Sequence, residues 1–131
     1  MARIGKPGLS YFNLDVHFFE CLPLQFVDAR FGHKGELIAI KLVCKIFKQQ
    51  GYFIKWDDDM AILFADAAGK NLTHCLVNDV VDELLKRDFF DKGMYTRYGI
   101  LTSADIQKNY TKACREAGRR RSIKDEYVIN P

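Results

Sequence analysis

Residues 52–59, YFIKWDDD, and residues 71–90, NLTHCLVNDVVDELLKRDFF, decide the fold of this 131-residue chain. The first stretch opens with aromatic and β-branched residues that favour a strand. Its three aspartates favour the start of a helix, because carboxylates cap free backbone N–H groups and suit the positive end of the helix dipole. In the second stretch, apolar residues recur every three or four positions over Leu76–Leu85, which is typical of an amphipathic helix.

The pattern predicts a strand, two helices joined by a short link around Gly69, and then a hairpin. The predicted helices are Asp58–Ala68 and Thr73–Lys86. Either Asn71 or Thr73 caps the second helix. The predicted strands are Tyr52–Lys55, Phe89–Asp91 and Gly99–Leu101. The loop Asp91–Gly99 between the last two strands would be a wing. The order of elements as a whole predicts a winged helix-turn-helix. This fold is α+β but mostly helical, with a small three-stranded antiparallel sheet.

Further helices flank this centre. One begins just after Pro23 and stops at Gly32, and a broad apolar face predicts another over Gly35–Gln49. The last is predicted over Ser103–Ala117, capped by Thr102 or Ser103. The chain then divides into an N-terminal extension packed on the body (1–23), a winged-helix domain (24–118) and a basic C-terminal tail (119–131).

The same periodicity predicts which side chains are buried. The predicted core residues are Leu42, Ile46, Leu63, Val77, Val81, Leu84 and Ile100. Trp56, between strand and helix, is also expected in the core. The four cysteines show no CxxC spacing, and Cys44 and Cys75 fall in apolar-rich helical patterns, so we expect buried, reduced thiols there.

Composition and motifs exclude several classes of protein. With 48% apolar and 28% charged residues, the chain is an ordinary globule. It has no apolar run approaching the roughly 20 residues of a membrane span and no signal peptide, so we expect a cytoplasmic location without membrane contact. No phosphate-binding glycine loop or HExxH motif occurs, and His17, His33 and His74 are isolated. We therefore predict no enzyme activity, no cofactor and no metal, and Asp57–Asp59 is interpreted as a helix cap rather than a metal site.

The net charge of +3 lies entirely at the C-terminal end, because residues 1–100 hold 13 basic and 13 acidic residues, and residues 101–131 hold 7 and 4. A neutral body with a basic end suggests an anionic partner, although a solvated helix end is the alternative. The candidate DNA contacts are Asn71, Thr73, His74, Lys92, Arg97, Arg115, Arg119, Arg120 and Arg121. Asp79, Asp82 and Glu83 would repel phosphate, so the wing and tail are the preferred contacts.

Three stretches resemble a known family: residues 2–19 (ARIGKPGLSYFNLDVHFF), 31–56 (FGHKGELIAIKLVCKIFKQQGYFIKW) and 83–103 (ELLKRDFFDKGMYTRYGILTS). They look like the N-terminal domain of bacterial phage and mobile-element replication proteins related to DnaD, in the primosome and replisome-organiser group. The likeness covers about residues 2–120. It implies a winged-helix fold, a place in initiating DNA replication, and self-association. It also implies a separate C-terminal DNA-binding domain; these 131 residues show none, so the chain is either a fragment or a naturally short protein.

Two hypotheses follow. The first is a DNA-associated module of a replication initiation or primosome-type protein, which binds DNA weakly through its basic wing and tail. The alternative is an assembly module that oligomerises or recruits other replication proteins and has little or no DNA binding of its own. The aromatic-rich segment 4–19 offers more apolar surface than a lone domain needs, so we expect it to lie near a self-association interface.

Overall fold

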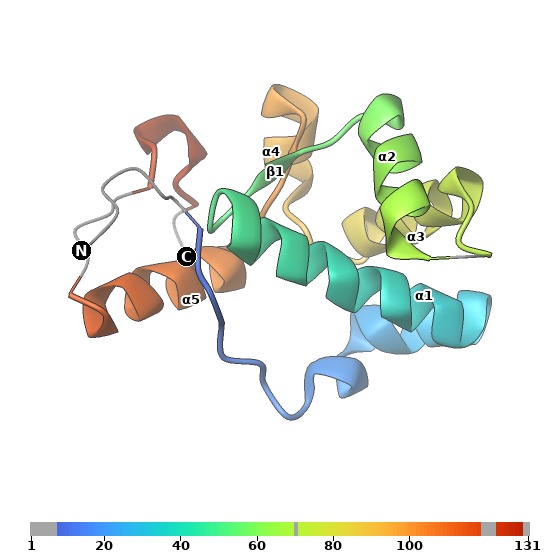
Figure 1. Cartoon of the computed structure of the whole chain (residues 1–131), viewed down its shortest axis with the longest axis horizontal. Helices are drawn as coiled ribbons and strands as arrows, with labels where there is room; N and C mark the ends of the chain where they lie inside the picture. The colour runs from blue at the N-terminus through green and yellow to red at the C-terminus, as the bar shows by residue number, and fades with distance from the viewer. Residues whose placement is uncertain (1–7, 70, 119–122, 130–131) are drawn as a thin grey trace.

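The computed structural model describes residues 8–69, 71–118 and 123–129, and it is mostly helical with one small sheet (Figure 1). This architecture confirms the expected α+β, helix-rich class. Its elements in chain order are η1 (Phe18–Glu20), α1 (Leu22–Gln49), β1 (Ile54–Lys55), α2 (Asp58–Ala68), α3 (His74–Lys86), α4 (Lys92–Tyr98), β2 (Ile100–Leu101), α5 (Ala104–Glu116) and η2 (Asp125–Tyr127). None of the helices among these residues is long and apolar enough to cross a membrane.

Helix α1 consists of two helical segments that meet at Gly32, which confirms the predicted stop at this residue. Gly32 has a φ of 69° and a ψ of −156°, which interrupts the helical backbone inside α1. A side chain at this position would meet nothing within 4 Å, so the backbone conformation, and not lack of space, is what favours glycine here. The second segment supplies most of the buried residues of α1.

Side-chain caps fix the starts of three helices close to where the sequence predicts them. The Asp57 carboxylate accepts a hydrogen bond from the Met60 N–H at 2.8 Å and starts α2. The Thr73 hydroxyl accepts from the Leu76 N–H at 3.1 Å, so Thr73, and not Asn71, caps α3. In α5 the cap is Ser103. The predicted ends of these helices agree with the structure to within one residue.

The sheet has two strands among the described residues, where the sequence predicts three. Strands β1 and β2 pair antiparallel, with Ile54 opposite Leu101. The strand predicted at Phe89–Asp91 is wrong. Phe90 is fully buried, and the Asp91 N–H donates to the Thr102 carbonyl at 2.8 Å, but residues 89–91 form no strand. Only five residues separate α3 from α4, and Asp91 already caps α4, so no strand forms between the two helices.

The predicted wing is a helix instead of a loop. The Asp91 carboxylate accepts from the Met94 N–H at 2.9 Å and starts α4, and Gly99 ends it with a φ of 66°. Met94 is buried against the body. The loop prediction is wrong because capping and burial on one side stabilise a helical turn that Gly93 alone disfavours.

The core lies where α3 packs against α1 and α2. Six of the seven predicted core residues are at most 2% exposed: Leu42, Ile46, Val77, Val81, Leu84 and Ile100. Leu63 is wrong, at 63% exposed, because α2 turns Ala61, Phe64 and Ala65 inward. Trp56 is buried as expected, whereas Cys44 and Cys75 are exposed. Both thiols therefore lie outside the buried faces of their helices.

Residues 123–129 pack onto the body, so the described part of the predicted tail is not free. The Gln107 side chain donates to the Tyr127 carbonyl at 2.7 Å and accepts from the Ile129 N–H at 2.9 Å. Tyr127 is 8% exposed, and its ring contacts those of Phe53 and Tyr98. The basic run Arg119–Arg121 lies outside the described residues.

Candidate functional site

Three of the predicted DNA contacts lie at the start of α3: Thr73 caps the helix, His74 is its first residue, and Asn71 lies in the turn before the cap. Asn71 and His74 are exposed, and Asn71 takes a left-handed backbone conformation with a φ of 70°. The Thr73 hydroxyl is already used as the cap of α3. The His74 Nε2 lies 3.7 Å from the Cys75 Sγ. Two of the three side chains are therefore available to a partner.

The middle of α3 faces an acidic surface. Burial raises the pKa of Asp82, and the nearby carboxylates of Asp79 and Asp58 raise it further. Burial likewise raises the pKa of the Tyr95 hydroxyl, followed by the effects of Asp82, Asp58 and Asp57. The carboxylates at the start of α2 and in the middle of α3 therefore lie close enough to repel one another. This surface opposes the approach of a phosphate backbone.

Glu83 is not part of that surface. It is only 6% exposed, and its carboxylate accepts a hydrogen bond from the Arg87 Nε at 2.9 Å and lies 3.3 Å from the Arg30 Nε. The Arg87 guanidinium also stacks over the Phe26 ring at 3.6 Å. The hydrogen bond from Arg87 lowers the pKa of Glu83 despite its burial, and Arg30 adds to this effect. The predicted repulsion of DNA by Glu83 is therefore wrong, since the residue joins α3 to α1.

The predicted basic contacts are dispersed. Lys92 begins α4 and lies 3.4 Å from the Asp88 carboxylate, and Arg97 lies in the last turn of α4. Arg115 lies in the last turn of α5. Helix α4, the end of α5 and the start of α3 occupy separate parts of the molecule (Figure 1). The described candidates therefore do not form one site, and Arg119–Arg121 lie outside the described residues.

Helix α5 carries a basic row that includes the predicted contact Arg115 and extends it toward the start of the helix. Lys108, Lys112 and Arg115 are exposed and follow one another at helical spacing, and none has an ion-pair partner in the part of the chain that the structure describes. Lys108 was not among the predicted contacts, and its i, i+4, i+7 spacing with Lys112 and Arg115 after a predicted cap was the signal that could have revealed it.

The N-terminal segment is anchored to the body at two places. The Leu9 N–H donates to the Phe47 carbonyl at 2.7 Å, and the Phe12 ring stacks on the Phe47 ring at 4.5 Å. Farther along, the Phe18 ring meets the Phe89 ring edge-on at 5.9 Å. Residues 13–17, here called the N-terminal arch, are all exposed between these anchors. Within the described part of this segment, residues 9, 12 and 18 therefore pack on the body, whereas residues 13–17 do not.

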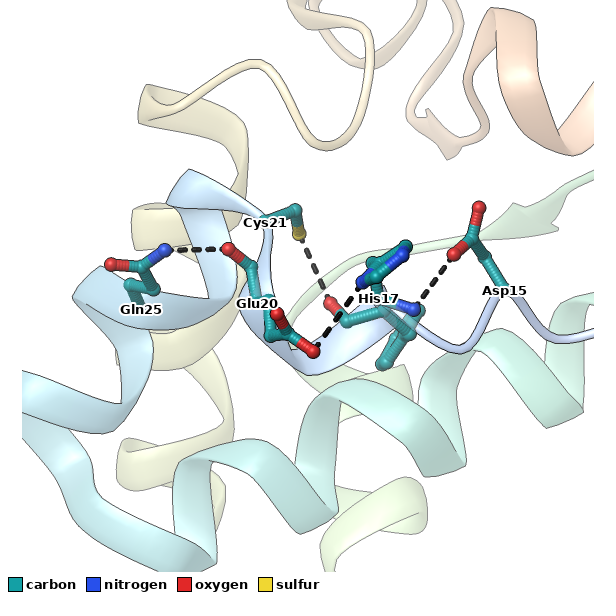
Figure 2. Close-up of polar contacts among 6 residues, drawn as sticks. Asp15, His17, Glu20, Cys21 and Gln25 are labelled. Atoms are coloured by element: carbon teal, nitrogen blue, oxygen red, sulfur yellow. Dashed lines mark hydrogen bonds and ion pairs between the residues drawn. The ribbon is translucent and has the colours of Figure 1, made fainter.

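Polar groups at the end of the arch hold its turn into η1 and α1 (Figure 2). The Asp15 carboxylate accepts from the His17 N–H at 2.7 Å, and the His17 Nδ1 lies 3.4 Å from the Glu20 carboxylate. The Gln25 side chain donates to the Glu20 carbonyl at 2.5 Å. All of these contacts are local and exposed, so they shape the segment and do not assemble a catalytic group.

The arch borders a groove whose opposite wall is α5. Val43, Phe47 and Phe89 supply apolar side chains to this groove, as do Phe12 and Phe18. Its charged lining differs between the two walls. The N-terminal segment contributes the acidic residues Asp15 and Glu20, whereas α5 contributes Lys108 and Lys112. Asp105 at the start of α5 and Asp88 also line the groove. No ion pair joins the two walls among the described residues.

Large apolar side chains from the same segment point into solvent. The exposed fractions are 83% for Tyr11, 45% for Leu14, 86% for Val16, 42% for Phe19 and 62% for Leu22. Single exposed apolar residues are normal on a protein surface, but a run of five within 12 residues is a feature of interaction sites. An exposed apolar face therefore adjoins a groove that carries carboxylates on the N-terminal segment and two lysines on α5.

Fold and surfaces together define a small, helix-rich α+β domain with an exposed apolar N-terminal segment. The chain belongs to the family described as Lin1244/Lin1753-like, N-terminal, whose model matches residues 11–106. It is 36% identical over 131 residues to the uncharacterized phage-related protein Lin1244/Lin1753 of Listeria innocua serovar 6a. That match covers 98% of this chain and 41% of the relative, so the chain spans about two fifths of the relative's length. No solved structure matches the chain.

Proposed function

We propose that this domain is an assembly module of a phage-related protein, and that it joins copies of itself through residues 11–22 and the neighbouring α5. The exposed apolar run from Tyr11 to Leu22 carries this proposal. Removing apolar surface from water contributes roughly 25 cal/mol per Å², so covering this face favours association. The acidic surface beside α3 disfavours the competing proposal, in which α3 reads the DNA major groove.

Charge complementarity supports a second copy as the partner. In a closed two-fold dimer the same patch is used by both subunits, so the arch of each copy faces α5 of the other. Asp15 and Glu20 then approach Lys108 and Lys112 of the second copy, and the exposed apolar side chains pack between them. Complementary charges at an interface fix the register and suppress other pairings.

Charge reversal tests this arrangement. The pair Lys108→Glu and Lys112→Glu makes both walls acidic, and the pair Asp15→Lys and Glu20→Lys makes both basic. Each double variant should be monomeric at concentrations where the unaltered chain is dimeric, because like charges then oppose each other at both contacts. An equimolar mixture of the two variants should dimerise, since every contact becomes attractive again. Light scattering coupled to size exclusion measures the mass of each sample.

Lys55→Glu with Arg97→Glu is the matched control, because it makes the same change of charge at two exposed residues that do not line the groove. This variant should keep the dimer mass. A monomeric unaltered chain at high micromolar concentration, or a mixture that stays monomeric, would contradict the proposal.

The winged-helix relationship and the link to DnaD-like replication proteins are part of the proposal. The order of one strand followed by two helices supports them, as does the antiparallel pairing of β1 with β2. Helix α4 in place of a wing is a departure from that fold. The role in initiating replication rests on the resemblance of residues 2–120, and the phage-related relative is compatible with it.

Weak DNA binding is the second candidate function, favoured by the basic row on α5, which the sequence continues into Arg119–Arg121. Duplex binding should then be steeply salt-dependent, with a Kd of about 10⁻⁴–10⁻⁶ M, as is typical of contacts to phosphate alone. Replacing Arg119, Arg120 and Arg121 by alanine should weaken binding equally for every sequence, and His74→Ala should change little. Fluorescence anisotropy at two salt concentrations measures both effects.

The two candidates respond oppositely to one variant. Asp15→Lys with Glu20→Lys adds positive charge beside α5, so it should strengthen DNA binding while it breaks self-association. An altered sequence preference in His74→Ala would instead show that α3 reads base edges.

A further inference from the structure

Three potential metal ligands converge at the break in α1. Asp28 precedes Gly32, and His33 and Glu36 follow it. One ligand atom from each side chain lies within 4.8 Å of the others, and the His33 Nδ1 is 3.4 Å from the Glu36 Oε1. We propose that Asp28, His33 and Glu36 bind a divalent transition-metal ion of the zinc class.

The break at Gly32 creates this set of ligands. In a continuous helix, residues five positions apart lie about 140° apart around the axis, so Asp28 and His33 would face different directions. Gly32, with its φ of 69°, reorients the chain between them. His33 and Glu36 share a face through ordinary i, i+3 spacing. The sequence interpretation, which treated His33 as isolated, could not detect this convergence.

The donor set suits a transition-metal ion. Zinc accepts one imidazole nitrogen and two carboxylate oxygens, and water can take the remaining position. An imidazole ligand favours such ions over magnesium or calcium, which prefer oxygen alone. Two carboxylates also balance the charge of a divalent cation. The nearby Arg30 is held 3.3 Å from Glu83, and Asp28 has no ion-pair partner among the described residues, so its carboxylate is available.

A bound ion would link the two segments of α1 directly. Asp28 lies in the first segment and the other two ligands lie in the second, so coordination restrains the angle at Gly32. The first segment also positions Arg30 against Glu83 of α3. Metal binding should therefore stabilise the folded chain, because a ligand that binds only the native state raises its stability.

Isothermal titration of the tag-free chain with zinc chloride tests the site. All variants carry Cys44→Ser and Cys75→Ser, since these exposed thiols are competing ligands. We expect one zinc ion per chain. Mutating a residue that only hydrogen-bonds to a metal ligand typically lowers metal affinity about 10–100-fold. Loss of a ligand itself should cost at least as much, so we expect His33→Ala or Asp28→Asn to weaken zinc binding at least about tenfold.

His17→Ala is the matched control. His17 and Glu20 form the same i, i+3 pair at the same 3.4 Å, but no third ligand joins them among the described residues. This variant should bind zinc as tightly as its parent. Zinc should also raise the melting temperature of the parent and of His17→Ala, but not that of His33→Ala. Unchanged affinity in His33→Ala, or an equal loss in His17→Ala, would overturn the proposal.

Discussion

Leu84→Ala should lower the free energy of unfolding by about 2–5 kcal/mol, the range for truncating a fully buried leucine. Leu84 lies on the inward face of α3 and is 0% exposed. The cost has two parts. The variant buries less apolar surface on folding, and the surrounding side chains only partly fill the cavity that is left. Urea denaturation followed by circular dichroism gives the free energy directly.

Leu63→Ala provides the matched control in α2. The substitution removes the same atoms, but Leu63 is 63% exposed. We expect a change within about 0.5 kcal/mol, as for most surface positions. Equal losses in the two variants would show that α2 and α3 are packed differently from the structure described here.

Arg87→Ala should lower the free energy of unfolding by about 3 kcal/mol, at the lower end of the range for breaking a buried ion pair. The substitution leaves the buried Glu83 carboxylate without its 2.9 Å hydrogen bond and removes the stacking on Phe26. Arg30 still reaches the carboxylate, which keeps the cost from being larger. Arg30→Ala is the control, and it should cost at most about 1 kcal/mol, because the Arg30 side chain is 54% exposed.

The effect of Arg87→Ala should also depend on pH. In the unaltered chain the pKa of Glu83 is lowered from its ordinary value of 4.5, chiefly by Arg87. A lowered folded-state pKa stabilises the protein above pH 4.5, and this contribution is lost as the pH falls through the folded-state value. The difference between the unaltered chain and Arg87→Ala should therefore be largest near pH 7 and should shrink in acid. A difference that stays constant down to acid unfolding would contradict the role assigned to Glu83.

Helix α4 shows why the sequence alone predicted a loop where the structure has a helix. Asp91, Met94 and Gly99 are a cap, an apolar anchor and a left-handed stop, which together are the signals of a short helix. Gly93 and the turn-like sequence Asp91–Gly93 pointed to a loop with similar strength. A helix of seven residues is marginal by itself, so packing of Met94 and Tyr95 on the body decides between the two.

The surfaces were less predictable than the core. Lys108 and Lys112 are far from Asp15 and Glu20 in the sequence, and only the folded chain places these four residues around one groove. Glu83 shows the same difficulty, since an acidic residue on a predicted DNA-facing helix is in fact buried against Arg30. Sequence spacing gives the face of a helix, but it does not give the element that packs there.

The sequence by itself determined the helices α2, α3 and α5, their capped starts to within a residue or two, and the buried stripe of α3. Those features depend on contacts between residues within about four positions of one another, which periodicity and capping rules describe. Only the tertiary structure decided the helical form of α4, the exposure of Leu63, the groove beside the arch and the approach of Asp28 to His33. Each of these depends on how distant segments pack, or on one backbone break, and neither leaves a periodic signal in the sequence.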